Sequence, residues 1–148
     1  MNKRRTDKSR FKLLRHRCIS ALVISGYCIV TFWLFWPYNP FVVNNIKICN
    51  SDRVVQPGQY LVYEMDVDKK LPLAAVINKQ LINDFIITYS PIYGNIPVGK
   101  RKMKVKLKIP SSAEPGEYVF KWEGVYKVNP LREVTVTAFS DPFYVERS

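Results

Sequence analysis

The chain has 148 residues, which is enough for one ordinary domain and an appendage. Its hydrophobic content of 47% excludes a largely disordered chain and a protein with many membrane spans. The net charge of +11 is concentrated in residues 1–17, where eight lysine or arginine residues against one acid, Asp7, leave +7. The remaining residues carry fifteen basic and eleven acidic side chains, which leave +4.

The first predicted element is a basic cytoplasmic tail, residues 1–17. Basic residues before an apolar segment keep that flank in the cytoplasm, and each contributes about 1 kcal/mol near anionic lipid headgroups. Such runs also neutralise nucleic-acid phosphates, but this one has no aromatic platform for reading bases, so nucleic acid is not an expected partner. The residues expected to set the orientation are Lys3, Arg4, Arg5, Lys8, Arg10, Lys12, Arg15 and Arg17.

Residues 18–38 are predicted to form one transmembrane helix that serves as a signal-anchor. No charged residue occurs between Cys18 and Ile46, and twenty-one helical residues span about 32 Å, close to the thickness of the hydrocarbon core of a bilayer. Aromatic side chains gather at the end of the segment, where they favour the headgroup region. These membrane-interface residues are Trp33, Trp36 and Tyr38.

A cleaved signal peptide and the core helix of a soluble domain are the other two interpretations of this segment. A cleaved signal has an apolar region of about 7–15 residues followed by small residues at the cleavage site. Here the apolar run is longer and ends in the bulky sequence FWLFWPYNPFVV. We therefore expect an uncleaved anchor in the cytoplasmic membrane, with the N-terminus in the cytoplasm and residues 39–148 exported to the periplasm or the cell exterior.

Beyond Pro37 the hydrophobic pattern changes to the two-residue alternation that is typical of β-strands. In residues 102–110, KMKVKLKIP, the pattern assigns the apolar side chains to one face and the lysines to the other. The other predicted strands are 42–49, 59–67, 74–79, 85–89, 117–124, 133–139 and 142–145. Residues 71–84 form the one stretch beyond residue 38 that is ambiguous between strand and helix.

Pro-Gly pairs precede two of these strands. Both Pro57-Gly58 and Pro115-Gly116 suit the centre of a type II turn, where proline presets φ and glycine adopts the positive value. Short strands separated by such turns predict an all-β fold, an antiparallel two-sheet sandwich preceded by one transmembrane helix.

The passage IPSSAEPGEYVFKW, residues 109–122, resembles part of the immunoglobulin-like and fibronectin-III-like modules of exported bacterial or phage proteins. In those modules a strand ends, a Pro-Gly turn follows, and a tyrosine-bearing strand begins. The resemblance implies an Ig-like sandwich and nothing about site residues or ligands. This chain also departs from antibody-type domains, because the paired cysteines are missing. Cys18 and Cys28 lie in the membrane segment, so Cys49 is either a small buried hydrophobe or a cross-link between two copies.

Catalytic constellations are not expected in residues 39–148. The single histidine, His16, lies in the tail, so neither a nucleophile–histidine pair nor a His/Cys metal site is predicted. Glu64, Asp66 and Asp68 are assigned to the solvent face of one strand, in preference to a calcium site or a glycosidase pair. The sequence therefore predicts no enzyme, no metal and no cofactor.

The candidate binding site is a ladder of basic residues in the strand at 102–110 and just before it. The functional hypothesis is an anionic docking strip for lipid headgroups, lipopolysaccharide, cell-wall polymer or an acidic protein. The alternative is an edge strand that lysines protect from unwanted pairing, partly neutralised by acids such as Glu117 or Glu123 on adjacent strands. The six basic residues are Lys100, Arg101, Lys102, Lys104, Lys106 and Lys108. The alternating aromatics Tyr118, Phe120 and Trp122 are expected to pack in the core.

Two functional hypotheses follow. The first is a single-pass membrane protein whose exported Ig-like sandwich is a non-catalytic interaction module at the cell envelope, with membrane lipid and another envelope protein, or a second copy, as partners. The alternative is a structural subunit of a membrane-associated homo-oligomeric assembly, such as a virion membrane or a secretion or conjugation apparatus.

Overall fold

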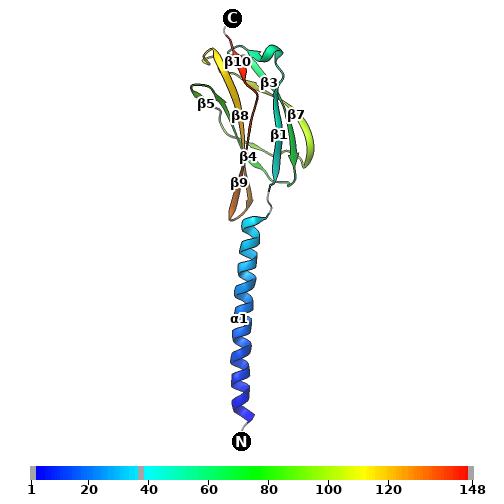
Figure 1. Cartoon of the computed structure of the whole chain (residues 1–148), viewed down its shortest axis with the longest axis vertical. Helices are drawn as coiled ribbons and strands as arrows, with labels where there is room; N and C mark the ends of the chain where they lie inside the picture. Colours follow the sequence, from blue (N-terminus) through cyan, green and yellow to red (C-terminus); the bar gives the residue numbers. More distant parts are fainter. Residues whose placement is uncertain (1–2, 37–38, 147–148) are drawn as a thin grey trace. The chain divides into compact units, whose positions relative to one another are not determined.

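The structure, a computed structural model, describes residues 3–36 and 39–146 of the chain, with the side chains of the helix described from Leu14 onward. The chain divides into two compact units, Met1–Tyr38 and Asn39–Ser148. The first unit holds one helix and the second is a body of β-strands, coloured from cyan to red in Figure 1.

Helix α1 runs from Lys3 to Phe35, so the basic tail and the apolar segment form one continuous element. It ends earlier than the predicted residue 38, because Pro37 disfavours the helical conformation at the residue before it. Within Leu14–Phe35 the most apolar 18-residue window has a mean hydropathy of 2.1, and none of that window is buried in the structure. Its apolar side chains form no single stripe. A helix that is apolar on all sides is stable only when lipid or protein surrounds it.

The β body contains short and long strands in nearly the predicted order. Their bounds are β1 Phe41–Ile48, β2 Val54–Val55, β3 Tyr60–Lys69, β4 Ala75–Ile82, β5 Ile86–Thr88, β6 Ile92–Gly94, β7 Gly99–Lys108, β8 Gly116–Asn129, β9 Arg132–Phe139 and β10 Phe143–Val145, with a short 3-10 helix, η1, at Ser51–Arg53. Every predicted strand is present, with shifted ends. The strands β2 and β6 were not predicted, because two or three residues are too few to show alternation.

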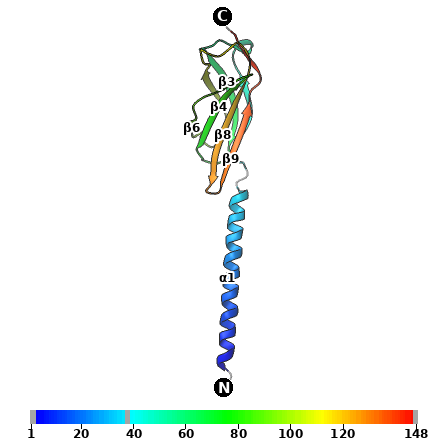
Figure 2. The same ribbon diagram turned by 90° about the vertical axis from the view of Figure 1, so that its left-hand side faces the viewer.

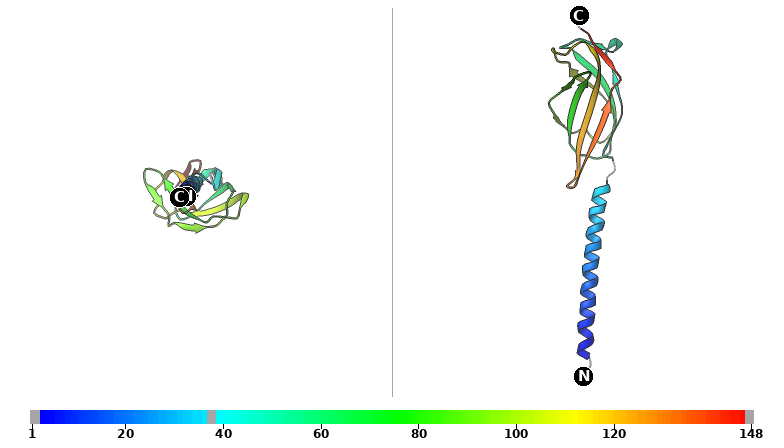
Figure 3. Two further views of the ribbon diagram at one scale, coloured as in Figure 1. Left: turned by 90° about the horizontal axis from the view of Figure 1, so that it is seen from below. Right: turned by 60° about the vertical axis from the view of Figure 1, so that its left-hand side comes forward.

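The strands form two sheets, which confirms the all-β class (Figure 1). The smaller sheet has the order β1-β3-β7, and the larger has the path β2-β10-β8-β4-β5, with β6 also on β4 and β9 also on β8. All pairings are antiparallel except that of β10 with β2. The long strand β8 pairs with β4 along one side and with β10 and then β9 along the other; Figures 2 and 3 show β8 and β9 as one hairpin.

A core of alternate side chains from both sheets holds the body together. Tyr118, Phe120 and Trp122 are 3%, 0% and 2% exposed, which confirms that they pack in the core. The ring of Tyr63 on β3 lies 4.6 Å from that of Phe120 on β8, centroid to centroid, and so joins the two sheets. Its burial raises the pKa of the Tyr63 hydroxyl. The ambiguous stretch 71–84 contains strand β4 because its alternate residues, among them Ile77 and Leu81, enter this core.

The two Pro-Gly pairs differ in conformation. Gly58 has a φ of 84°, and the Gln59 N–H donates to the Gln56 carbonyl at 3.0 Å, which confirms a type II turn at Pro57-Gly58. The same prediction is wrong for Pro115-Gly116, because Gly116 has a φ of 156°. Gly116 pairs with Val145 of β10, so the ladder holds it as the first residue of a strand.

Gly124 leaves room for an aromatic cluster. Trp122, Gly124 and Tyr126 point inward from β8, and the Phe41 ring lies 5.5 Å from the Trp122 ring and 5.4 Å from the Tyr126 ring. A Cβ at Gly124 would lie 2.5 Å from the Trp122 indole and 3.0 Å from the Tyr126 ring. The missing side chain therefore allows both rings to lie over the β8 backbone and to contact Phe41.

We expect Gly124→Ala to lower the free energy of unfolding by about 2–3 kcal/mol, because the packed rings cannot move aside. Gly94→Ala is the matched control. Its Cβ would lie 2.5 Å from the Ile77 Cδ1 atom, the end of a flexible side chain, so we expect a loss below about 1 kcal/mol. Urea unfolding of the full chain in detergent, followed by tryptophan fluorescence, measures both. Equal losses would contradict the role assigned to Gly124.

Candidate interaction site on the three-stranded sheet

The lysine ladder lies on β7, which pairs with β3 in an unbroken antiparallel register from Tyr60↔Lys108 to Lys69↔Gly99. The five lysines of β7 are exposed, whereas Leu107 and the following Ile109 are 6% and 0% exposed. Met103 and Val105 are half-buried against the core. The predicted alternation of faces is therefore confirmed for these residues.

Arg101 departs from the predicted docking strip. It has the opposite parity to the lysines, so it lies on the inner side of β7, where its guanidinium donates to the Val98 carbonyl at 3.4 Å. Nearby, Lys69 is only 2% exposed, and its ammonium donates to the Leu73 carbonyl at 2.6 Å and to Asn95 Oδ1 at 2.9 Å. Burial lowers the pKa of Lys69, and the charge of Arg101 lowers it further. Lys69 is therefore part of the packed interior and Arg101 is half-buried, so neither belongs to the exposed strip.

Acidic residues of β3 lie directly opposite three of the lysines. The register pairs Asp68 with Lys100, Asp66 with Lys102 and Glu64 with Lys104. Lys106 and Lys108 lie opposite Val62 and Tyr60, which carry no charge. The charges of the ladder are therefore compensated from Lys100 to Lys104 and uncompensated at Lys106 and Lys108.

The prediction that Glu117 and Glu123 partly neutralise the ladder is wrong, because both belong to β8 of the other sheet. Glu117 accepts a hydrogen bond from the Tyr144 hydroxyl at 2.7 Å. Glu123 lies 3.0 Å from the Lys121 ammonium and also accepts from Asn78 Nδ2. The Lys121 hydrogen bond is the main cause that lowers the pKa of Glu123, followed by the one from Asn78.

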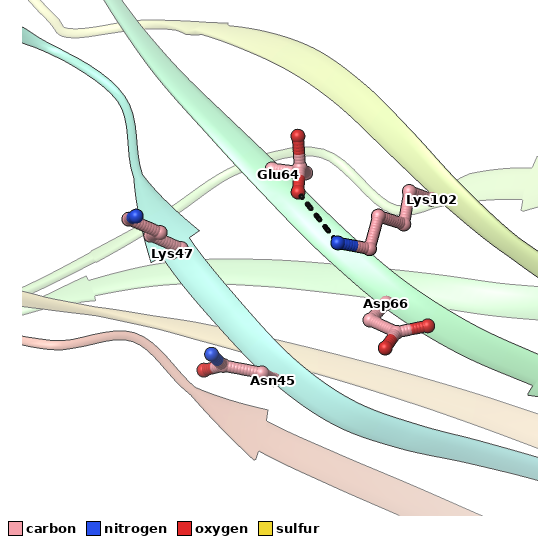
Figure 4. A pocket seen from close by; sticks show the side chains of 5 residues that line it. All are labelled: Asn45, Lys47, Glu64, Asp66 and Lys102. Atoms are coloured by element: carbon pink, nitrogen blue, oxygen red, sulfur yellow. Dashed lines mark ion pairs between the residues drawn. The ribbon is translucent and has the colours of Figure 1, made fainter.

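Polar side chains from all three strands of the smaller sheet line a hollow of about 180 Å³ on its outer face. Figure 4 shows Asn45 and Lys47 on β1, Glu64 and Asp66 on β3, and Lys102 on β7. The Lys102 ammonium lies 3.8 Å from a Glu64 carboxylate oxygen. Their side chains are 71% and 39% exposed, so solvent screens the pair and limits its contribution to about 1 kcal/mol or less. The hollow presents two ammonium groups, two carboxylates and one amide, a set that suits polar contact with another macromolecule.

The residues predicted in the tail and at the membrane interface lie in the other unit. Arg15, Arg17, Trp33 and Trp36 are exposed. The remaining residues fall outside the described residues or side chains: Lys3, Arg4, Arg5, Lys8, Arg10, Lys12 and Tyr38.

Cys49 is exposed, so the interpretation as a small buried hydrophobe is wrong. Among the described residues, no three histidine, cysteine or acidic side chains gather in an arrangement that could hold a metal ion.

Comparison with known proteins gives little similarity. No protein-family model and no curated protein matches the chain. One similar solved structure is the Pseudomonas fluorescens alkylpurine DNA glycosylase AlkC bound to DNA containing an abasic site analog. The identity is 9% and the TM-score 0.40, and the match covers 73% of this chain and 31% of the glycosylase chain. This chain therefore spans about a third of that protein, and a TM-score of this size supports no inference about fold or activity.

The register makes a prediction about charge reversal. Lys102→Glu places a carboxylate opposite Asp66 and beside Glu64, so we expect the free energy of unfolding to fall by about 1 kcal/mol. Lys108→Glu, the matched control, faces Tyr60, so its effect should stay within about 0.5 kcal/mol. Urea unfolding of both variants at low and high salt measures the difference, which salt should reduce. Equal effects would contradict the pairing of lysines with β3 acids.

Proposed function

We propose that the protein is a single-pass membrane protein that displays an Ig-like β-sandwich at the cell envelope as a non-catalytic interaction module. The observation that carries the proposal is the exposed helical segment Leu14–Phe35, which is free of charge from Cys18 onward and is joined to a β body with a core of its own. The helix has the length to cross a bilayer, and the β body keeps its buried apolar residues between Phe41 and Val145.

The energetics of insertion favour this assignment. Nine isoleucine, leucine, valine and phenylalanine residues lie in 18–38, and each favours insertion by about 0.3–0.6 kcal/mol at the middle of the membrane. The basic residues precede the apolar segment, and the two tryptophans lie near its other end. This asymmetry supports a cytoplasmic N-terminus and an exported β body.

The charged face of β1, β3 and β7 supports binding rather than catalysis. It presents six lysines, on β1 and β7, and three carboxylates, on β3. Charges spread over an exposed sheet face give electrostatic complementarity to a partner surface, which affects association rate and specificity. Another envelope protein with a surplus of acidic residues is the partner that this face suits.

The topology is tested by alkaline phosphatase fused after Ser148, an enzyme that is active only in an oxidising compartment. We expect activity for the unaltered chain, because the basic tail stays in the cytoplasm. A cytoplasmic fluorescent reporter at the same position is the control and should stay dark. Replacing the eight basic residues of the tail with glutamine should reduce the exported fraction. An inactive phosphatase fusion together with a bright fluorescent fusion would overturn the proposal.

A homo-oligomeric structural subunit is the second candidate, and the exposed Cys49 gives it a direct test. Native mass measurement and oxidation of the full chain in its membrane distinguish the two candidates. A defined homo-oligomer with a disulfide at Cys49, lost in Cys49→Ser, favours the subunit. A monomer, or one copy in complex with another envelope protein, favours the interaction module.

A further inference from the structure

Among the described strands, β7 pairs with β3 alone, so one of its edges is unpaired. It is the last strand in the order β1-β3-β7 and lies against β3. The opposite edge strand of the same sheet, β1, comes close to β9 of the other sheet. The free edge of β7 is long, because its register with β3 continues without a bulge from residue 99 to residue 108.

The main-chain groups on this free edge belong to the lysines. The Ile109 N–H donates to the Gln59 carbonyl at 2.8 Å and the Ile109 carbonyl accepts from Gly58, so Ile109 points toward the β3 side. Successive residues of a strand direct these groups to alternate sides, so the even-numbered residues point away from β3. The Lys108 carbonyl accordingly accepts from the Tyr89 hydroxyl at 2.9 Å. Lys102, Lys104 and Lys106 are left with N–H and C=O groups directed outward.

Side chains beside this edge specify the chemistry of a strand that could join it. On the outer face such a strand would lie beside the lysines, and on the inner face beside the half-buried Met103 and Val105. A strand in the adjacent position, about 4.8 Å away, would therefore need acidic residues on one face and apolar residues on the other. It would also remove Met103 and Val105 from water.

The pairing already present in the protein has this pattern. β3 places Glu64, Asp66 and Asp68 opposite lysines, while its alternate residues from Leu61 to Val67 are buried. A second copy of β7 would not fit this edge. Edge-to-edge pairing would bring two rows of lysines together, and like charges in opposite positions are destabilising. The edge thus excludes β7 of another copy and favours an acidic strand.

We propose that the free edge of β7 binds a segment of another protein by β-strand addition, and that this segment alternates acidic with apolar residues. The inference rests on the proposed function, since it specifies the partner of the same charged face. Main-chain hydrogen bonds to Lys102, Lys104 and Lys106 supply affinity, and the lysines with Met103 and Val105 supply specificity. The uncompensated charge of Lys106 attracts the acidic face of the incoming strand.

A peptide that copies residues 60–69, YLVYEMDVDK, is a suitable probe because β7 pairs with this sequence within the protein. The full chain held in nanodiscs is titrated with the labelled peptide and with two controls. One control has the same composition without alternation, and the other has lysine in place of the three acids. We expect both controls to bind at least about tenfold more weakly, because each loses the paired contacts of one face.

Amide hydrogen exchange distinguishes strand addition from simple contact with the lysine side chains. Binding should slow exchange at the amides of Lys102, Lys104 and Lys106. It should leave those of Met103 and Val105 unchanged, because they already donate to β3. Bound peptide without this alternating protection would overturn the proposal.

Lys104→Pro and Lys104→Gln form a matched pair of variants. Both remove the charge, but only proline removes the outward N–H, and the altered group makes no bond to β3. We expect Lys104→Pro to weaken binding about tenfold more than Lys104→Gln, because proline removes one main-chain hydrogen bond and places its ring at the edge. Equal binding by the two variants would overturn strand addition. If the proline variant does not fold, hydrogen exchange on the unaltered chain decides.

The two proposals fail in different experiments. An inactive phosphatase fusion with a bright fluorescent fusion overturns the membrane module, whatever the result of the peptide titration. Export of the reporter together with no binding of the peptide, or equal binding of all three peptides, overturns strand addition alone.

Discussion

The continuous antiparallel pairing of β3 with β7 is the constraint on which the rest of the β body depends. Because the register has no bulge, every odd-numbered apolar residue of both strands faces the larger sheet and contributes to one core. The same register brings the acids of β3 opposite lysines of β7 and leaves β7 as the last strand of its sheet. The core, the charged face and the open edge therefore have one common origin.

Lysines on an edge strand have two consequences that arise from the same electrostatics. They oppose pairing with an identical strand, which protects the protein from edge-to-edge aggregation. They also attract a strand with the opposite charge, as β3 demonstrates within the fold. Protection and selective binding are thus compatible functions of one sequence, and the charge of the approaching strand decides between them.

The two units are stabilised by different environments. The β body buries its apolar residues between its own sheets, whereas the described apolar side chains of α1 between Cys18 and Phe35 are not buried. In the proposed anchoring, lipid provides that cover. Under the same proposal, the tether would raise the effective concentration of the β body near other envelope proteins, so that a strand interaction of modest affinity would be sufficient.

Local periodicity in the sequence determined the apolar helix, the strands and the faces of residues 102–110, because these patterns are properties of consecutive residues. The prediction grouped Arg101 with the lysines by charge alone, and this was wrong because Arg101 has the opposite parity in β7. Only the tertiary structure decided that Glu64, rather than Glu117 or Glu123, lies near the ladder. Register between distant strands depends on how both sheets pack, and no local pattern encodes it. The extended Gly116 and the free edge of β7 likewise follow from which strand lies alongside, since a strand has two equivalent sides until the fold occupies one of them.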